Sequence, residues 1–154
     1  MSEKEMMHAI GFFEGLPIDD PNSFIDTKEE IPKAVGRDLL VKVQAVSVNP
    51  VDTKLRQTAR TSNALRVLGF DAVGEVAAVG NEVDNFKVGD HVFYAGTTTR
   101  HGSNQEYQIV DERIVALAPE KLTKEEAASL PLTSLTAYEL SLIHISEPTR
   151  RSYI

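Results

Sequence analysis

The sequence predicts a mainly β fold with a helical segment at its C-terminal end, on three observations. Short apolar segments alternate with turn residues over most of the chain, which is typical of antiparallel barrels and sandwiches. In the clearest segment, Asp38–Val48, the apolar residues Leu39, Val41 and Val43 occupy every second position, as on one face of a strand. At Pro119 this period of two ends, and helix-forming residues follow.

Six further strands are expected, and the first two are expected to pair with each other. They are Met7–Phe13, Ser23–Thr27, Val67–Val79, His91–Ala95, Gln105–Val110 and Ile114–Ala118. The third contains Gly69 and Gly74. Glycines inside a strand pattern indicate bulges or a close approach of two backbones, as a barrel needs where it bends.

A helix is expected to begin directly after the Asp38–Val48 strand. Asn49 at the cap and Pro50 at the first helical position are a good start signal, and Val51–Gln57 contains helix formers. Asp52 would suit the positive end of the helix dipole. Near the C-terminus, Thr123 to Glu126 has the form of a capping box, and two short helices separated near Pro131 are expected.

Composition excludes several classes of function. The 154 residues include no cysteine, which excludes disulfides, a thiolate nucleophile and cysteine-based metal sites. The net charge of −7 with scattered Lys and Arg argues against binding nucleic acid. The apolar runs are too short to span a membrane, and the N-terminus lacks the apolar core of a signal peptide, so a cytoplasmic protein is expected.

Five motifs, in this order, resemble the GroES-like domain of the medium-chain dehydrogenase/reductase superfamily. They are Asn49-Pro50-Val51-Asp52, Gly69 to Val76, Val79-Gly80, Phe86 to Val92, and Ala127 to Glu139. Each motif is weak by itself, but the order and the spacing together are specific. The resemblance implies a GroES-like, partly open β-barrel with short helices over residues 1–122, and linking helices over residues 123–140.

The resemblance also implies a dinucleotide-binding (Rossmann) domain that is absent from this sequence. No G-x-G-x-x-G motif occurs, and residues 141–154 match nothing in the family. Within them, Leu142 to Arg150 resembles translated sequencing-adaptor sequence. The expectation is therefore a truncated chain with an artefactual tail, inactive by itself because the cofactor site is missing.

Within this resemblance, two positions favour the zinc-independent, quinone oxidoreductase branch of zinc-type alcohol dehydrogenase-like proteins. By resemblance, Asn49 stands at the position of a zinc-binding Cys, and Phe70 at that of a zinc-binding His. Phenylalanine cannot bind a metal, and Asn is a poor zinc ligand, so no metal site is expected. By resemblance, the whole enzyme would reduce quinones or α,β-unsaturated carbonyl compounds with NADPH, and would be a homodimer with no nucleic-acid or membrane partner.

Asn49, Lys54 and Thr136 are the site residues that the resemblance implies. Asn49 would lie beside the nicotinamide and donate an amide N–H to the substrate carbonyl, Lys54 would supply a charge or proton, and Thr136 would pack near the nicotinamide. Each has a structural alternative: Asn49 as a helix cap only, Lys54 as a solvated lysine, and Thr136 as an ordinary helix residue. Asp71 is expected to be a buried, hydrogen-bonded structural carboxylate.

Two other functions remain open from the sequence. A stand-alone GroES-like binding module would need a mobile apolar loop, and the Leu16–Asn22 and Thr97–Asn104 loops are polar. A zinc-dependent alcohol dehydrogenase is disfavoured by Asn49, Phe70 and the lack of cysteine.

Overall fold

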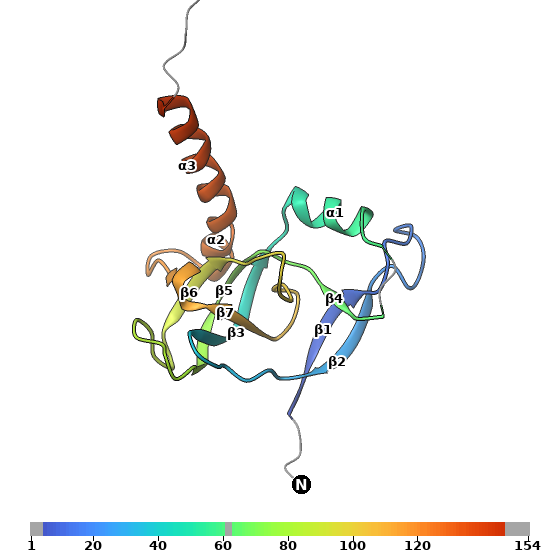
Figure 1. Cartoon of the computed structure of the whole chain (residues 1–154), viewed down its shortest axis with the longest axis horizontal. Coiled ribbons are helices and arrows are strands. Elements are labelled where there is room, and N and C mark those ends of the chain that lie inside the picture. Colours follow the sequence, from blue (N-terminus) through green and yellow to red (C-terminus); the bar gives the residue numbers. More distant parts are fainter. Residues whose placement is uncertain (1–4, 61–62, 147–154) are drawn as a thin grey trace, which may run out of the picture.

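The computed structural model describes residues 5–60 and 63–146, which form two antiparallel sheets and three α-helices (Figure 1). The smaller sheet has the order β2-β1-β4 and contains β1 (Met6–Phe12), β2 (Ile25–Glu30) and β4 (Arg66–Val67). The expected pairing of the first two strands is confirmed, with Met6 opposite Glu30, although β2 begins two residues later than expected.

The larger sheet has the order β7-β3-β5-β6-β8. Its strands are β3 (Asp38–Ser47), β5 (Asp71–Val79), β6 (His91–Ala95), β7 (Tyr107–Asp111) and β8 (Val115–Leu117). The two sheets do not close into a full barrel, and an isolated bridge between Ala9 and Gln105 links them. Every strand pair in the described residues is antiparallel, so this part of the chain contains no parallel strand-helix-strand unit.

The main hydrophobic core lies against the larger sheet. Its buried members come from four strands and are Leu39, Val41, Ala72, Val76, Val92, Tyr94 and Val110. The hydroxyl of Tyr94 donates a hydrogen bond to Oε1 of Gln108 at 2.8 Å, so the one polar group of this cluster is satisfied. The alternation that predicted β3 holds in its first half, where Leu39 and Val41 face this core.

The two glycines of the Val67–Val79 segment act as predicted, but the segment forms two strands, with Gly69 between them. Gly69 has φ +107° and lies in the break between β4 and β5. Gly74 lies inside β5, where a Cβ atom would come within 2.3 Å of the Lys42 carbonyl oxygen. The β3–β5 register shifts between Val43 and Ala45, next to this close approach, as expected for a bulge.

The three helices begin where the sequence predicted them. They are α1 (Pro50–Gln57), α2 (Lys124–Ala128) and α3 (Pro131–Ser146). The short 3₁₀ turn η1 (Glu112–Ile114) was not predicted, and it delays β8 by one residue. None of the helices in the described residues is long and apolar enough to cross a membrane.

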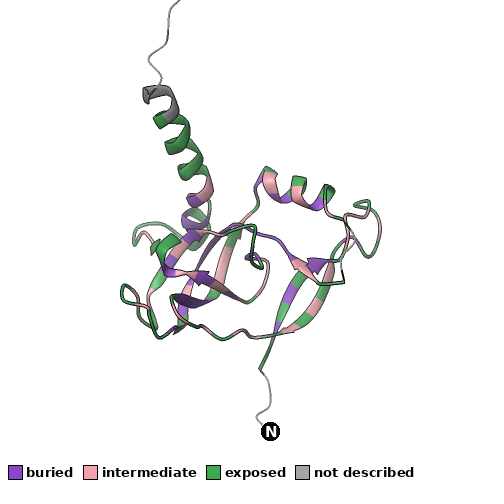
Figure 2. Cartoon of the chain, in the orientation of Figure 1, coloured by how far each residue is buried: buried purple, intermediate pink, exposed green. Residues whose placement is uncertain are grey.

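Helix α3 is longer than the short helix expected and extends past Leu140 into the segment expected to be a foreign tail. It projects away from the sheets, and its residues 133–142 are exposed (Figures 1 and 2). Residues 147–154, the rest of that segment, lie outside the described residues.

Candidate functional site

The start of helix α1 is fixed by the carboxylate of Asp52. Asn49, at the end of the connection from β3, occupies the N-cap position. Oδ2 of Asp52 accepts a hydrogen bond from the Asn49 backbone N–H at 2.8 Å, and Oδ1 accepts one from the Gly69 N–H at 3.1 Å. The expected role of Asp52 at the helix N-terminus is confirmed, and the same side chain also fastens α1 to the turn before β5.

The side chain of Asn49 lies against a second buried carboxylate, Asp71. Its Nδ2 atom donates a hydrogen bond to Oδ2 of Asp71 at 2.8 Å. The same atom donates a longer one, of 3.4 Å, to the Ser47 carbonyl oxygen. Only 7% of Asn49 is exposed. A hydrogen bond of 3.4 Å is weak, so one N–H of the amide is held firmly and the other loosely.

Asp71 joins the Asn49 amide to helix α3. Its Oδ1 atom accepts a hydrogen bond from the Leu132 backbone N–H, in the first turn of α3, at 2.8 Å. The residue is fully buried, which confirms the expectation of a buried, hydrogen-bonded carboxylate. Burial raises the pKa of Asp71 above its ordinary value, against the opposing effect of the hydrogen bonds from Asn49 and Leu132, and the nearby charge of Asp52 adds to the rise.

Thr136 and Lys54 lie on the two helices that this network connects. Thr136 is one turn beyond Leu132 on α3, is exposed, and donates its hydroxyl to the Leu132 carbonyl oxygen at 2.8 Å. Lys54 is exposed on α1, and no hydrogen bond or ion pair from a described residue holds its ammonium group. The structure therefore connects Asn49 with the start of the Thr136 helix, and leaves Lys54 outside the network.

Sequence reasoning missed the two contacts that assemble this site. Asp71 and Leu132 are 61 positions apart, and the Asp52–Gly69 bond spans 17 positions. A carboxylate inside an apolar strand does signal that a buried partner exists, because an unpaired buried charge is costly. It does not say which N–H group supplies the hydrogen bond.

The positions that would hold zinc by resemblance carry Asn49 and Phe70. Phe70 is buried and offers no donor atom. Among residues 5–60 and 63–146, no three His, Asp or Glu side chains come together in a group that could hold a metal ion.

Residues 36–120 match the model of the alcohol dehydrogenase GroES-like domain. The chain belongs to this family. The matched segment begins just before β3, runs through the larger sheet, and includes Asn49, Asp52 and Asp71. The GroES-like barrel that the motifs implied is therefore confirmed, and α2 and α3 follow the matched segment.

A zinc-type alcohol dehydrogenase-like protein of Staphylococcus epidermidis is 53% identical over 133 residues, which cover 86% of this chain and 39% of that protein. The chain thus spans about two fifths of the length of this curated relative. A structure from Rhizobium etli CFN 42, described as a candidate zinc-dependent alcohol dehydrogenase, is 44% identical with a TM-score of 0.90. The aligned region covers 97% of this chain and 44% of the Rhizobium etli chain.

Other similar proteins carry names that specify a reaction or a cofactor. The quinone oxidoreductase of Coxiella burnetii is 31% identical with a TM-score of 0.78, over 88% of this chain and 44% of its own. A mycobacterial protein, Rv1454c, solved in complex with NADPH, is 31% identical with a TM-score of 0.73, over 87% of this chain and 39% of its own. The 2-methylene-furan-3-one reductase of Solanum lycopersicum is 36% identical over 124 residues, 75% of this chain and 32% of that enzyme.

Proposed function

We propose that this chain is the substrate-side part of a longer, zinc-independent oxidoreductase that uses NADPH to reduce quinones or α,β-unsaturated carbonyl compounds. The observation that carries the proposal is the series of hydrogen bonds from Asn49 through Asp71 to Leu132, which connects the cap of α1 to the helix of Thr136. The NADPH complex of the mycobacterial relative and the named reactions of the Coxiella and tomato relatives support the cofactor and substrate class.

In this proposal Asn49 binds the carbonyl oxygen of the substrate. NADPH supplies the hydride when it is bound. Negative charge then develops on the carbonyl oxygen, which takes the place of the Ser47 carbonyl as acceptor of the loosely held Asn49 N–H and is stabilised by that hydrogen bond. The bond to Asp71 holds the other N–H and so fixes the plane of the amide.

Thr136 and Lys54 have supporting roles in the same proposal. Thr136 lies on the exposed side of α3, where a hydroxyl can contact a nicotinamide bound between this domain and a second one. Lys54 has an exposed ammonium group on α1, without a hydrogen-bond or ion-pair partner among the described residues, that can supply positive charge or a proton to the reduced oxygen. A solvated lysine with no role in the reaction is the alternative for Lys54, and its lack of partners fits either.

The residues present do not fit a zinc ion. A catalytic zinc needs three protein ligands of the Cys, His or carboxylate type. Phe70 provides none, Asn49 turns its amide nitrogen toward Asp71, and both oxygens of Asp52 and of Asp71 already accept hydrogen bonds. We therefore propose a reaction without metal, in a cytoplasmic homodimer that acts on small molecules and binds neither nucleic acid nor membrane.

The test joins residues 1–140 to the C-terminal remainder of the Staphylococcus epidermidis relative. After dialysis against EDTA, NADPH consumption is followed with 1,4-benzoquinone and with 3-penten-2-one. We expect turnover of at least one acceptor, and a loss in kcat of about 10²–10³-fold for Asn49→Ala, the usual effect of removing one such hydrogen-bond donor. Asn22→Ala, on an exposed loop, is the matched control. A joined protein that binds NADPH but reduces neither acceptor, or needs added zinc, would overturn the proposal.

NADPH titrated into the 154-residue chain, with nicotinamide fluorescence as readout, tests where the cofactor site lies. We expect no saturable binding, because the phosphate-binding half belongs to the longer protein. Tight binding by the short chain would contradict that assignment.

A further inference from the structure

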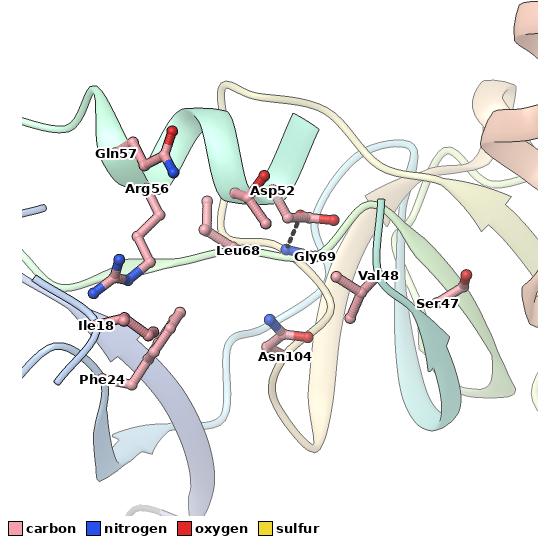
Figure 3. Close-up of a pocket in the computed structure, with 11 residues that line it drawn as sticks. Ile18, Phe24, Ser47, Val48, Asp52, Arg56, Gln57, Leu68, Gly69 and Asn104 are labelled. Carbon is pink, nitrogen blue, oxygen red and sulfur yellow. Dashed lines mark hydrogen bonds between the residues drawn. The ribbon is translucent and has the colours of Figure 1, made fainter. Parts of the chain in front are cut away.

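A cavity of about 520 Å³ lies beneath helix α1, on the side of the small sheet (Figure 3). Its walls are mainly apolar and include Ile18, Phe24, Val48 and Leu68. This volume is within the range of small-molecule sites in proteins, roughly 300–1,000 Å³. Asn49, Lys54 and Thr136 are not among the described residues that line it, although Ser47 and Asp52, which contact Asn49, are, so the cavity borders the proposed reaction site.

The guanidinium group of Arg56 projects from α1 into this cavity (Figure 3). Arg56 is only 8% exposed. Its Nη2 atom donates to the Leu16 carbonyl oxygen at 2.7 Å, and its Cζ atom lies 5.0 Å from the centre of the Phe24 ring. Its Nε atom is buried and has no hydrogen-bond partner among the described residues.

This arrangement is unusual because the cation has no anionic partner in the part of the chain that the structure describes. No described carboxylate forms an ion pair with Arg56. Charged side chains are almost never fully buried unless they are paired, since the loss of hydration must be compensated. One carbonyl and one aromatic ring compensate only part of that loss.

Asp52 also lines the cavity but does not fill this role. Its two oxygens accept hydrogen bonds from the Asn49 and Gly69 N–H groups, at the N-terminus of α1, so its charge is compensated there. Figure 3 shows Asp52 turned toward Gly69, while Arg56 points in the other direction, toward Ile18 and Phe24.

We infer that this cavity binds a small monocarboxylate with an apolar body, whose carboxylate pairs with Arg56. The fork of N–H groups on a guanidinium matches the two oxygens of a carboxylate. A single cation among apolar walls favours one negative charge on an otherwise apolar molecule. The side-chain amide of Asn104, on the cavity wall, offers a further polar contact. The inference does not depend on the proposed reductase activity.

Octanoate is the probe, titrated into the 154-residue chain by calorimetry, with 1-octanol as its neutral counterpart. We expect saturable binding of octanoate, and a loss of affinity of about tenfold or more in Arg56→Gln, because a charge-assisted hydrogen bond is lost. Octanol binding should be unchanged by that substitution. Arg60→Gln removes the same charge from an exposed position next to α1, and should leave octanoate binding intact.

A second measurement on the unaltered chain keeps the inference testable if Arg56→Gln fails to fold. The Arg56 Nε–H signal in a ¹H–¹⁵N spectrum should shift on addition of octanoate and should not shift with octanol. No octanoate binding at millimolar concentration, equal binding of octanoate and octanol, or an unmoved Nε–H signal at saturation would each overturn the inference. The last two outcomes would mean that Arg56 only fastens the Leu16 loop.

Discussion

The buried carboxylate of Asp71 should make the stability of the chain depend on pH. Burial raises its pKa in the folded chain above the ordinary value that applies in the unfolded chain. Such a group stabilises the fold fully below the ordinary pKa, and this stabilisation is lost as pH rises through the folded-state pKa. Asp71→Asn removes the titration, and its amide oxygen can still accept from Leu132. Its stability relative to the unaltered chain should therefore improve as pH rises from 4 to 7.

Urea midpoints at several pH values measure this difference. Asp19→Asn, on an exposed loop, removes an equal charge without burial and is the matched control. If the Asp71→Asn difference were constant, or moved in favour of the unaltered chain with rising pH, Asp71 would not be a buried carboxylate with a raised pKa.

At the same scale, the sequence predicted the local contacts of the site and missed the distant ones. Asn49, Pro50 and Asp52 lie close together in the sequence, so the start of α1 and the place of Asp52 at its N-terminus follow from helix chemistry alone. The Asp71–Leu132 bond depends on how α3 docks on β5, which no short stretch of sequence encodes. The burial of Arg56 was missed because arginine within a short polar helix is normally solvated, and its cover is the Leu16 loop, 40 positions away.

Among the elements, the pair β3–β5 should tolerate no side chain at Gly74. A Cβ atom there would lie 2.3 Å from the Lys42 carbonyl oxygen and 2.5 Å from Cγ1 of Val41. Because the first contact is with backbone, the strands must separate to relieve it. We expect Gly74→Ala to lower the free energy of unfolding by about 3 kcal/mol, the upper end of the usual cost of overpacking.

Gly36→Ala is the comparison variant for this prediction. Gly36 has φ +57° but no atom within 4 Å of a new Cβ, so Gly36→Ala tests backbone strain alone. This strain should lower the free energy of unfolding by about 1 kcal/mol. Urea denaturation of both variants gives the difference. A Gly74→Ala chain as stable as Gly36→Ala would show that the bulge beside Gly74 absorbs a side chain.

The strands were predictable where each has one buried face, and less so elsewhere. β6 begins and ends at the predicted residues, because turn residues precede it and a polar loop follows it. The segment Val67–Val79 looked continuous since apolar residues lie on both sides of Gly69, yet the positive φ of Gly69 ends β4 and lets β5 join the other sheet. The length of α3 was underestimated, because its expected end was set by where the family pattern stops.

At the scale of the whole molecule, helix α3 differs from the barrel because most of its length is not packed against another element. α3 contacts β5 and β6 near its start, and then leaves the barrel with Leu135, Tyr138 and Leu142 exposed at i, i+3 and i+7 spacing. These positions share one helix face. Tyr138 alone is 65% exposed. Exposed apolar faces of this kind mark surfaces that associate with another protein surface.

We therefore expect the 154-residue chain to self-associate through α3, despite its net charge of −7. Sedimentation velocity should show a mass that rises with concentration, and the double variant Leu135→Glu/Tyr138→Glu should remain a monomer of 17.0 kDa. Thr133→Glu adds one negative charge to the exposed first turn of α3 and is the control for charge repulsion. It should associate less than the unaltered chain at low salt, and equally in 0.5 M salt, because salt screens the added charge. The double variant should stay monomeric at that salt concentration. A monomeric unaltered chain at all concentrations would mean that the barrel surface covers this helix face in solution.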